Sequence, residues 1–139
     1  MNIIAKSYLE SYERLYRRSE RIAEQIELLE SRTTGTQSFR YNHDKVSSSI
    51  KSDIFDLVDH KIQLESIFQK LRHEMDDIEA GIREAVSSLP DQDQKIAVMT
   101  WIDLEGSYYI AQTLKISRST VLRRRAEICA AVQAWLDTT

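Results

Sequence analysis

Apolar residues recur at alternating steps of four and three along the first part of the chain. This spacing places them on one side of a helix and is typical of a coiled-coil seam. No glycine or proline interrupts residues 1–34, so the pattern predicts one helix over about residues 3–31. The seam comprises Tyr8, Tyr12, Leu15, Ser19, Ile22, Ile26 and Leu29.

The same spacing returns after the polar segment RTTGTQSFRYNH, residues 32–43, which is predicted to be a loop because it contains Gly35. The second seam predicts a helix from about Asp44 to Ser88, which ends near Pro90 because a proline disfavours helical geometry in the residue before it. Together the two seams predict a long antiparallel helical hairpin over residues 1–89. The second seam comprises Ile50, Ile54, Leu57, Lys61, Leu64, Phe68, Leu71, Met75, Ile78, Ile82, Ala85 and Leu89.

The two predicted helices differ in length, so the first covers the second only to about residue 74. The apolar stripe from Met75 to Leu89 then lacks a partner within the hairpin. Because exposed apolar surface favours burial, either a second chain or the C-terminal segment must cover this stripe. We expect a homodimer through the stripe. A fold-back of Trp101 and Ile102, which would leave a monomer, is the alternative.

Residues 90–139 contain shorter units, which predict three helices. Asp91 is placed to cap the first, which is expected to end near Gly106. Ser107 and Ser117 are placed to cap the second and third, the third running to about Leu136, with Lys115 and Ile116 in the turn between them. Three glycines and one proline in 139 residues also favour helices. We therefore predict an all-α protein with an oligomerising hairpin followed by a C-terminal helix-turn-helix.

Charge is distributed unevenly along the chain. The net charge is −3, yet residues 107–125 hold five basic side chains and no acidic one. Four of these are arginines within ISRSTVLRRRAEI, residues 116–128. A one-signed helix face implies a polyanionic partner, and double-stranded DNA is the partner we expect.

A helical wheel of the third predicted helix, taken with the residues just before it, separates the candidate contact residues by role. With Val121 inward, three residues near the helix start face outward and are candidates for reading bases in the major groove. Four others are better placed for phosphates, and Arg125 lies close to the core side. The base-reading candidates are Arg118, Ser119 and Arg123. The phosphate candidates are Tyr108, Lys115, Thr120 and Arg124.

The segment LEGSYYIAQTLKISRSTVLRRRAEI, residues 104–128, resembles the helix-turn-helix of sigma-factor region 4 and of related response regulators. The chain as a whole resembles the small phage-encoded ArpU-like transcription regulators. The resemblance implies a DNA-binding regulator, with RNA polymerase as a further partner. Two positions depart from the pattern, since Lys115 replaces the usual glycine of the turn and Tyr109 replaces an acid. The matching residues are Gly106, Ile110, Ala111, Leu114, Ile116, Ser117, Ser119, Thr120 and Val121.

Two other functions remain open beside a sequence-specific transcription regulator. One is a DNA-packaging subunit of a phage terminase, and the other is an adaptor that docks on RNA polymerase without reading DNA. An enzyme is not expected, because the sequence shows neither a phosphate-binding glycine loop nor a nucleophile–base pair. The acidic pairs at residues 76–77 and 91–93 are expected to be solvated or capping.

Neither a metal, a cofactor nor a membrane is an expected partner. His43, His60 and His73 lack ligand spacing, and no apolar run approaches the roughly 18 residues of a membrane span. The first residues have no uninterrupted apolar core like that of a signal peptide. The lone Cys129 cannot form an intrachain disulfide, which favours a reducing, cytoplasmic location, and its place on the buried flank of the last helix predicts an inert thiol.

Overall fold

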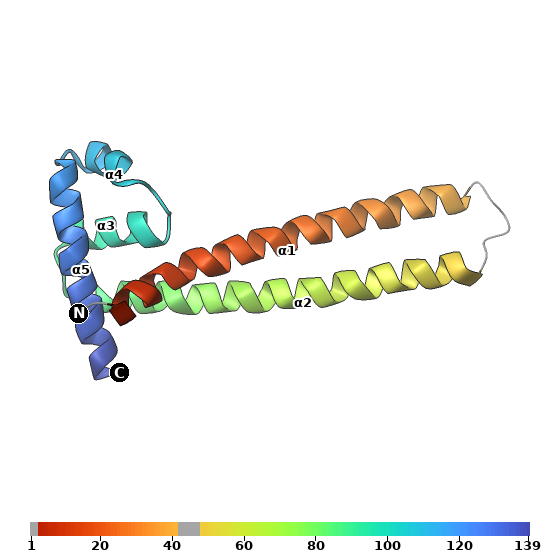
Figure 1. Ribbon diagram of the computed structural model, residues 1–139, viewed down its shortest axis with the longest axis horizontal. Coiled ribbons are helices and arrows are strands. Elements are labelled where there is room, and N and C mark those ends of the chain that lie inside the picture. The colour runs from red at the N-terminus through yellow and green to blue at the C-terminus, as the bar shows by residue number, and fades with distance from the viewer. Residues whose placement is uncertain (1–2, 42–47) are drawn as a thin grey trace. The chain divides into compact units, whose positions relative to one another are not determined.

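The computed structural model describes residues 3–41 and 48–139, with side chains for residues 4–32 and 53–139. All regular elements in these ranges are helices, which confirms the all-α class (Figure 1). The segment 42–47, which holds His43 and the expected helix start at Asp44, lies outside the described residues, as does the side chain of Ile50. The helices are α1 (Ile3–Tyr41), α2 (Ser48–Ala85), α3 (Asp91–Trp101), α4 (Ser107–Leu114) and α5 (Arg118–Thr138).

Helix α1 is longer than the sequence pattern predicts. The prediction of a loop over residues 32–43 is wrong for residues 32–41, because α1 continues through Gly35 to Tyr41. A single glycine costs a helix interior only about 1 kcal/mol, and no proline is present to break the backbone hydrogen bonding. Both α1 and α2 contribute residues to two compact units of the chain.

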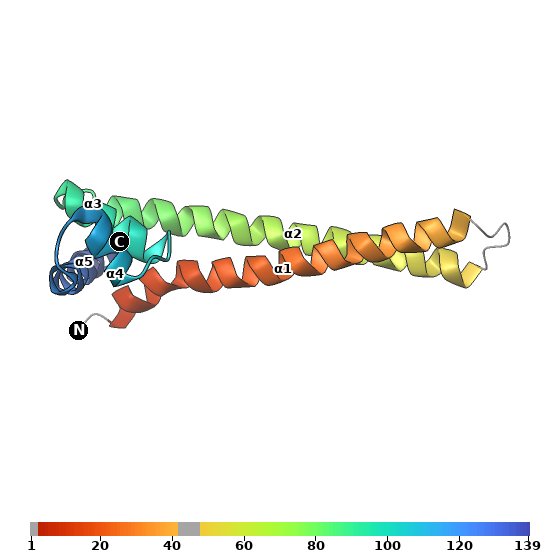
Figure 2. The ribbon, with the colours of Figure 1, turned by 90° about the horizontal axis from the view of Figure 1, so that it is seen from above.

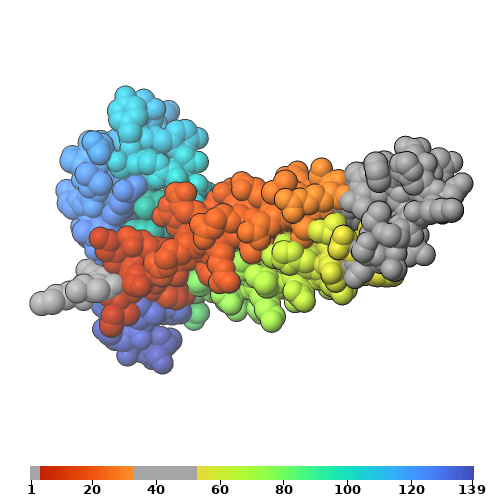
Figure 3. All heavy atoms as spheres, turned by 45° about the vertical axis from the view of Figure 1, so that its right-hand side comes forward, coloured from red at the N-terminus to blue at the C-terminus, as the bar shows by residue number. Residues whose placement is uncertain are grey.

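The unit Tyr16–His73 consists of parts of α1 and α2, which run antiparallel and side by side (Figures 1 and 2). In the space-filling view the orange atoms of α1 lie directly against the yellow-green atoms of α2 (Figure 3). The most buried apolar side chains follow the seams that the sequence predicts. They are Leu29, Ile54, Leu64 and Leu71.

The two polar seam positions of this unit both have partners. Ser19 is buried, and its Oγ donates to the backbone oxygen of Tyr16 at 2.7 Å. Lys61 Nζ lies 3.2 Å from a carboxylate oxygen of Glu30 and 3.6 Å from one of Glu65. The hydrogen bond to Glu30 raises the pKa of Lys61 above its usual range. Neither polar residue therefore leaves an unsatisfied group in the seam.

The second unit comprises Met1–Leu15 and Glu74–Thr139, and one apolar core runs through it. Helices α3, α4 and α5 contact one another pairwise. Residues of α2 and the first turns of α1 belong to the same core cluster. The buried members are Ala5, Leu9, Ile82, Ala85, Val86, Ile96, Ala97, Ile110, Ala111, Val121, Ile128 and Val132.

The stripe at the end of α2 is buried within the chain. Met75 is 1% exposed and Ile82 is fully buried, while Trp101 and Ile102 pack against the core that contains Ile82. Of the two arrangements predicted for this stripe, the structure shows the one in which the C-terminal segment folds back and covers it. The expectation that α1 covers α2 only to residue 74 is also wrong, because Leu9 joins the same cluster. The stripe therefore no longer supports a dimer interface.

Several helix ends differ from the predicted ones. Pro90, not Asp91, occupies the N-cap of α3, and no side chain caps it. Helix α3 ends at Trp101, and Leu104 rather than Gly106 takes the left-handed conformation, at φ 58°. Gly106 is the N-cap of α4, so Ser107 is its first residue and not its cap. None of the described helices has an apolar stretch long enough to cross a membrane.

Gly81 allows a close contact between three helices. The ring centroids of Tyr8 and Trp135 are 5.8 Å apart, and both side chains reach the position that a Cβ at Gly81 would occupy. That Cβ would overlap the Tyr8 hydroxyl and lie 3.2 Å from the Trp135 ring. Nearby, the backbone N–H of Ala5 donates to Gln133 Oε1 at 3.1 Å, which ties the start of α1 to α5.

We predict that Gly81→Ala lowers the free energy of unfolding by about 1–3 kcal/mol, because the methyl group forces Tyr8 out of its packed position. Urea unfolding followed by circular dichroism measures this. The cost should shrink in a Tyr8→Phe background, where the overlapping hydroxyl is absent. A gain of about 1 kcal/mol, as helix propensity alone would give, would contradict the contact.

Candidate nucleic-acid interface

Helices α4 and α5 are joined by a turn of three residues. Lys115 adopts the left-handed conformation in this turn, with φ 59° and ψ 44°. This agrees with its position, where the helix-turn-helix modules that the segment resembles usually have glycine. The backbone N–H of Ile116 donates to the carbonyl of Ala111 at 3.0 Å and closes the end of α4. Ala111 is buried and small, and this permits α4 and α5 to approach closely.

Ser117 caps α5 as the sequence predicts. Its Oγ accepts a hydrogen bond from the backbone N–H of Thr120 at 3.1 Å. The same oxygen lies 2.7 Å from Thr120 Oγ1 and 3.1 Å from Ser119 Oγ. This cap leaves other N–H groups of the first turn free of intrahelical partners, and the helix dipole adds partial positive charge there. The start of α5 is therefore suited to an anion.

The exposed side chains at the start of α5 form one outward face. Val121 is fully buried, while Arg118, Ser119 and Arg123 are exposed. Arg118 Nε donates to Ser107 Oγ at 2.9 Å, which holds this guanidinium beside the first residue of α4. Among the described residues, Arg123 has no hydrogen-bond or ion-pair partner. Its donors are therefore free for a ligand.

The other two arginines of the basic stretch face α3. Arg124 Nη1 lies 2.8 Å from Asp93 Oδ1, and the Asp93 side chain is only 9% exposed. Arg125 Nε donates to Thr100 Oγ1 at 3.2 Å. Burial, with a smaller effect from the charge of Arg118, lowers the pKa of Arg125. Arg125 therefore contacts α3 through its guanidinium, and Arg124 contacts α3 in the same way.

These contacts revise two sequence-based expectations. Asp93 was expected to be solvated or capping, and this is wrong because it is buried against Arg124. The flanking position of Arg124 predicts a phosphate contact, whereas its Nη1 pairs with the Asp93 carboxylate, which favours a structural role. A helical wheel could not show this pairing, because Asp93 lies 31 residues away in the sequence.

The remaining predicted contact residues are Tyr108 on α4, Lys115 in the turn and Thr120 in the first turn of α5. Tyr108 is 69% exposed, Lys115 is exposed, and Thr120 is half-buried within the Ser117 cap. Tyr109, beside Tyr108, is also exposed. Sequence reasoning overlooked Leu122, which is exposed on α5 although it is apolar. Its position one residue after the buried Val121 is a signal that could have revealed it.

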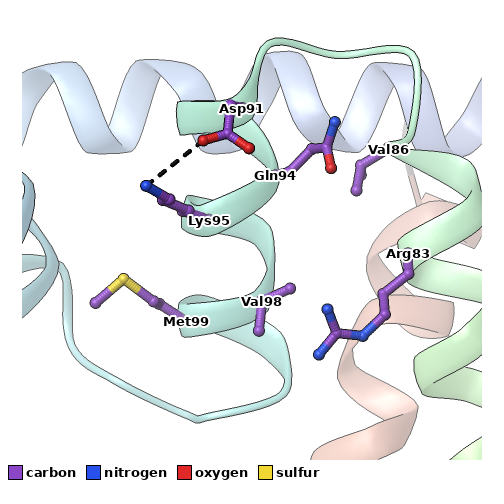
Figure 4. Close-up of a pocket in the computed structure, with 7 residues that line it drawn as sticks. All are labelled: Arg83, Val86, Asp91, Gln94, Lys95, Val98 and Met99. Atoms are coloured by element: carbon purple, nitrogen blue, oxygen red, sulfur yellow. Dashed lines mark ion pairs between the residues drawn. The ribbon is translucent and has the colours of Figure 1, made fainter.

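A pocket of about 460 Å³ lies between the end of α2 and α3 (Figure 4). Its charged residues have partners, since Lys95 Nζ lies 3.5 Å from Asp91 Oδ2 and Arg83 Nε lies 3.7 Å from a Glu79 oxygen. No buried side-chain polar atom among the described residues lacks a hydrogen-bond partner. The pocket therefore indicates no particular ligand chemistry. Its lining residues are Arg83, Val86, Asp91, Gln94, Lys95, Val98 and Met99.

Metal-binding or thiol chemistry finds no support in the described part of the chain. No three His, Cys, Asp or Glu side chains there come together as a metal site requires. Cys129 is half-buried, and burial together with the charge of Glu10 raises the pKa of its thiol. A thiol that stays protonated is a poor nucleophile. The start of α5, with its arginines and free N–H groups, is the surface best suited to a ligand.

Comparison of the chain with family models, with curated proteins and with solved structures finds no match.

We predict that Asp93→Ala lowers the free energy of unfolding by about 1–3 kcal/mol, because it leaves Arg124 partly buried without its carboxylate. Asp91→Ala is the matched control. Its carboxylate lies two residues away in the same turn, is 84% exposed, and should matter by about 0.5 kcal/mol or less. Urea unfolding compares the two variants, and equal effects would refute a structural role for the pair.

Proposed function

We propose that this protein is a sequence-specific DNA-binding transcription regulator that reads the major groove of double-stranded DNA with the start of α5. The observation that carries the proposal is the exposed face of Arg118, Ser119 and Arg123, which directly follows the Ser117 cap. Buried Val121 orients this face away from the core. In recognition helices, residues near the N-terminus contact base edges.

The geometry around α5 supports a helix-turn-helix interpretation. Two helices joined by a short turn, with a left-handed residue at Lys115, match the arrangement such modules use. Arg118 and Arg123 can each offer two donors to O6 and N7 of guanine, and Ser119 can contact either type of base edge. Tyr108, Lys115 and Thr120 are assigned to phosphates, which position the protein. We leave Arg124 out of the contact set because of its pair with Asp93.

Electrostatics favour the same surface for DNA. The chain is acidic overall, at −3, but its charge between residues 107 and 125 is wholly positive. An acidic protein that concentrates its positive charge on one helix can still bind a polyanion there, because charges beyond a Debye length of about 10 Å are largely screened. Affinity should therefore fall steeply with salt.

Selection of random duplexes by gel shift tests the proposal. A regulator enriches one motif, and footprinting on natural DNA then protects a discrete promoter site. A protected site at a packaging start would indicate the terminase subunit instead. Protection that requires RNA polymerase would indicate the adaptor. No enrichment and no protection under any of these conditions would overturn DNA binding.

A homodimer remains part of the proposal on functional grounds only. One recognition helix offers few base contacts, and regulators commonly place two of them on half-sites about 34 Å apart. The buried stripe at Met75–Leu89 gives this no support. The selected motif tests it directly, because a symmetric dimer selects a palindrome and a monomer selects a single half-site.

We predict that Arg123→Ala weakens binding to the selected motif by about 1–3 kcal/mol and relaxes preference at one base pair. Its guanidinium is exposed and has no described partner. Arg83→Ala, which removes an exposed cation of α2, is the control and should leave the motif unchanged. Equal losses on selected and random duplexes would show a phosphate contact rather than base reading.

We predict that Lys115→Gly acts in opposite directions on stability and on DNA binding. Glycine tolerates the left-handed conformation, so the free energy of unfolding should rise by up to about 1 kcal/mol. Loss of one phosphate contact should reduce the slope of log affinity against log salt by about 1. Chemical unfolding and a salt titration of duplex binding measure the two effects. An unchanged salt slope would remove Lys115 from the interface.

A further inference from the structure

Leu122 is an exposed apolar residue within the face that α5 turns outward. Its exposed fraction is 46%, and Ser119, Arg123 and Ala126 are exposed around it. A single exposed leucine is common on protein surfaces and by itself carries no meaning. Its location gives it significance, because Arg118 lies one turn before it and Arg123 follows it directly. The leucine thus lies between the two arginines of the proposed interface.

The direction of the side chain places it within reach of the groove. Residues three and four apart share a helix face, so Leu122 shares its face with Arg118 and Ser119. Helical side chains also lean toward the N-terminus of their helix. The Leu122 methyl groups therefore cover the first turn of α5, which is the part that enters a major groove in such modules. Ala126, one turn further on, is too short to reach as far.

The chemistry of base edges restricts what an apolar group can contact there. In the major groove the edges of guanine, adenine and unmethylated cytosine present polar donors and acceptors, while thymine also presents its C5 methyl group. An apolar side chain pressed against a polar edge leaves that edge without a hydrogen-bond partner, which costs free energy. Contact with a thymine methyl removes two apolar surfaces from water at once.

We propose that Leu122 is a specificity-determining residue that selects thymine by contact with its C5 methyl group. This inference rests on the proposed function of the same surface. It adds an apolar determinant to the guanine contacts assigned to the two arginines. The recognised sequence should then contain at least one position where thymine is required for its methyl group and not for its hydrogen bonds.

The test uses the full-length protein and the duplex obtained by selection. Each thymine is replaced in turn by deoxyuridine, which removes only the methyl group and leaves base pairing intact. At one position this replacement should weaken wild-type binding about three- to tenfold, as expected for loss of one buried methyl contact. Leu122→Ala should bind the thymine duplex as weakly as the wild type binds the uridine duplex. It should also no longer distinguish the two.

The controls separate this contact from general effects. Leu122→Met retains an apolar side chain of similar volume and should keep the sensitivity to uridine. Leu28→Ala, which removes another exposed leucine, should behave as the wild type. Because Leu122 is exposed, its variants should keep the wild-type melting temperature.

Each outcome decides the inference. Loss of the uridine effect in Leu122→Ala alone supports it. It is overturned if the wild type tolerates uridine at every position, or if Leu122→Ala stays as sensitive as the wild type. In both of those cases a selected motif still exists, so the proposed function stands. If selection enriches no motif, the proposed function fails, and the role of Leu122 fails with it.

Discussion

Burial of one face of α5 is the constraint on which the other features of the candidate interface depend. Val121, Ile128 and Val132 are fully buried in the core shared with α3 and α4. A helix that buries this stripe has only one rotation available, and that rotation turns Ser119 and Arg123 outward. The chemistry of the exposed face is thus a consequence of core packing. Any change that rotated α5 would redirect the proposed contacts of Arg118, Ser119 and Arg123 together.

The arginines of the basic stretch fall into two groups, two that pack against α3 and two that lie on the proposed interface. Arg124 and Arg125 hydrogen-bond to Asp93 and Thr100 of α3, so part of the positive charge strengthens the packing of the unit. The exposed arginines, Arg118 and Arg123, remain for a ligand. Asp93 of α3 thus helps to hold the helix that carries the proposed interface. It positions the helix without weakening the charge of the outward face.

The long helices α1 and α2 pack in two different ways along their length. In the unit Tyr16–His73 they pair through a heptad seam whose polar members, Ser19 and Lys61, are satisfied locally. In the other unit the end of α2 and the first turns of α1 join a core made mostly of the shorter helices. Within that unit, Gly81 gives Tyr8 and Trp135 room to pack where a side chain would collide.

The sequence by itself determined the helical class, the seams, the Ser117 cap and the outward placement of Arg123. These features depend on residues a few positions apart, where helical periodicity and turn chemistry act. Only the tertiary structure decided that the Met75–Leu89 stripe is covered by the same chain, that Asp93 is buried and that Arg124 pairs with it. Those outcomes depend on residues far apart in the chain. An apolar stripe is equally well buried by any complementary surface. A charged side chain pairs with whichever opposite charge the packing brings near it. The local sequence pattern therefore predicts neither which surface covers the stripe nor which residue pairs with the charge.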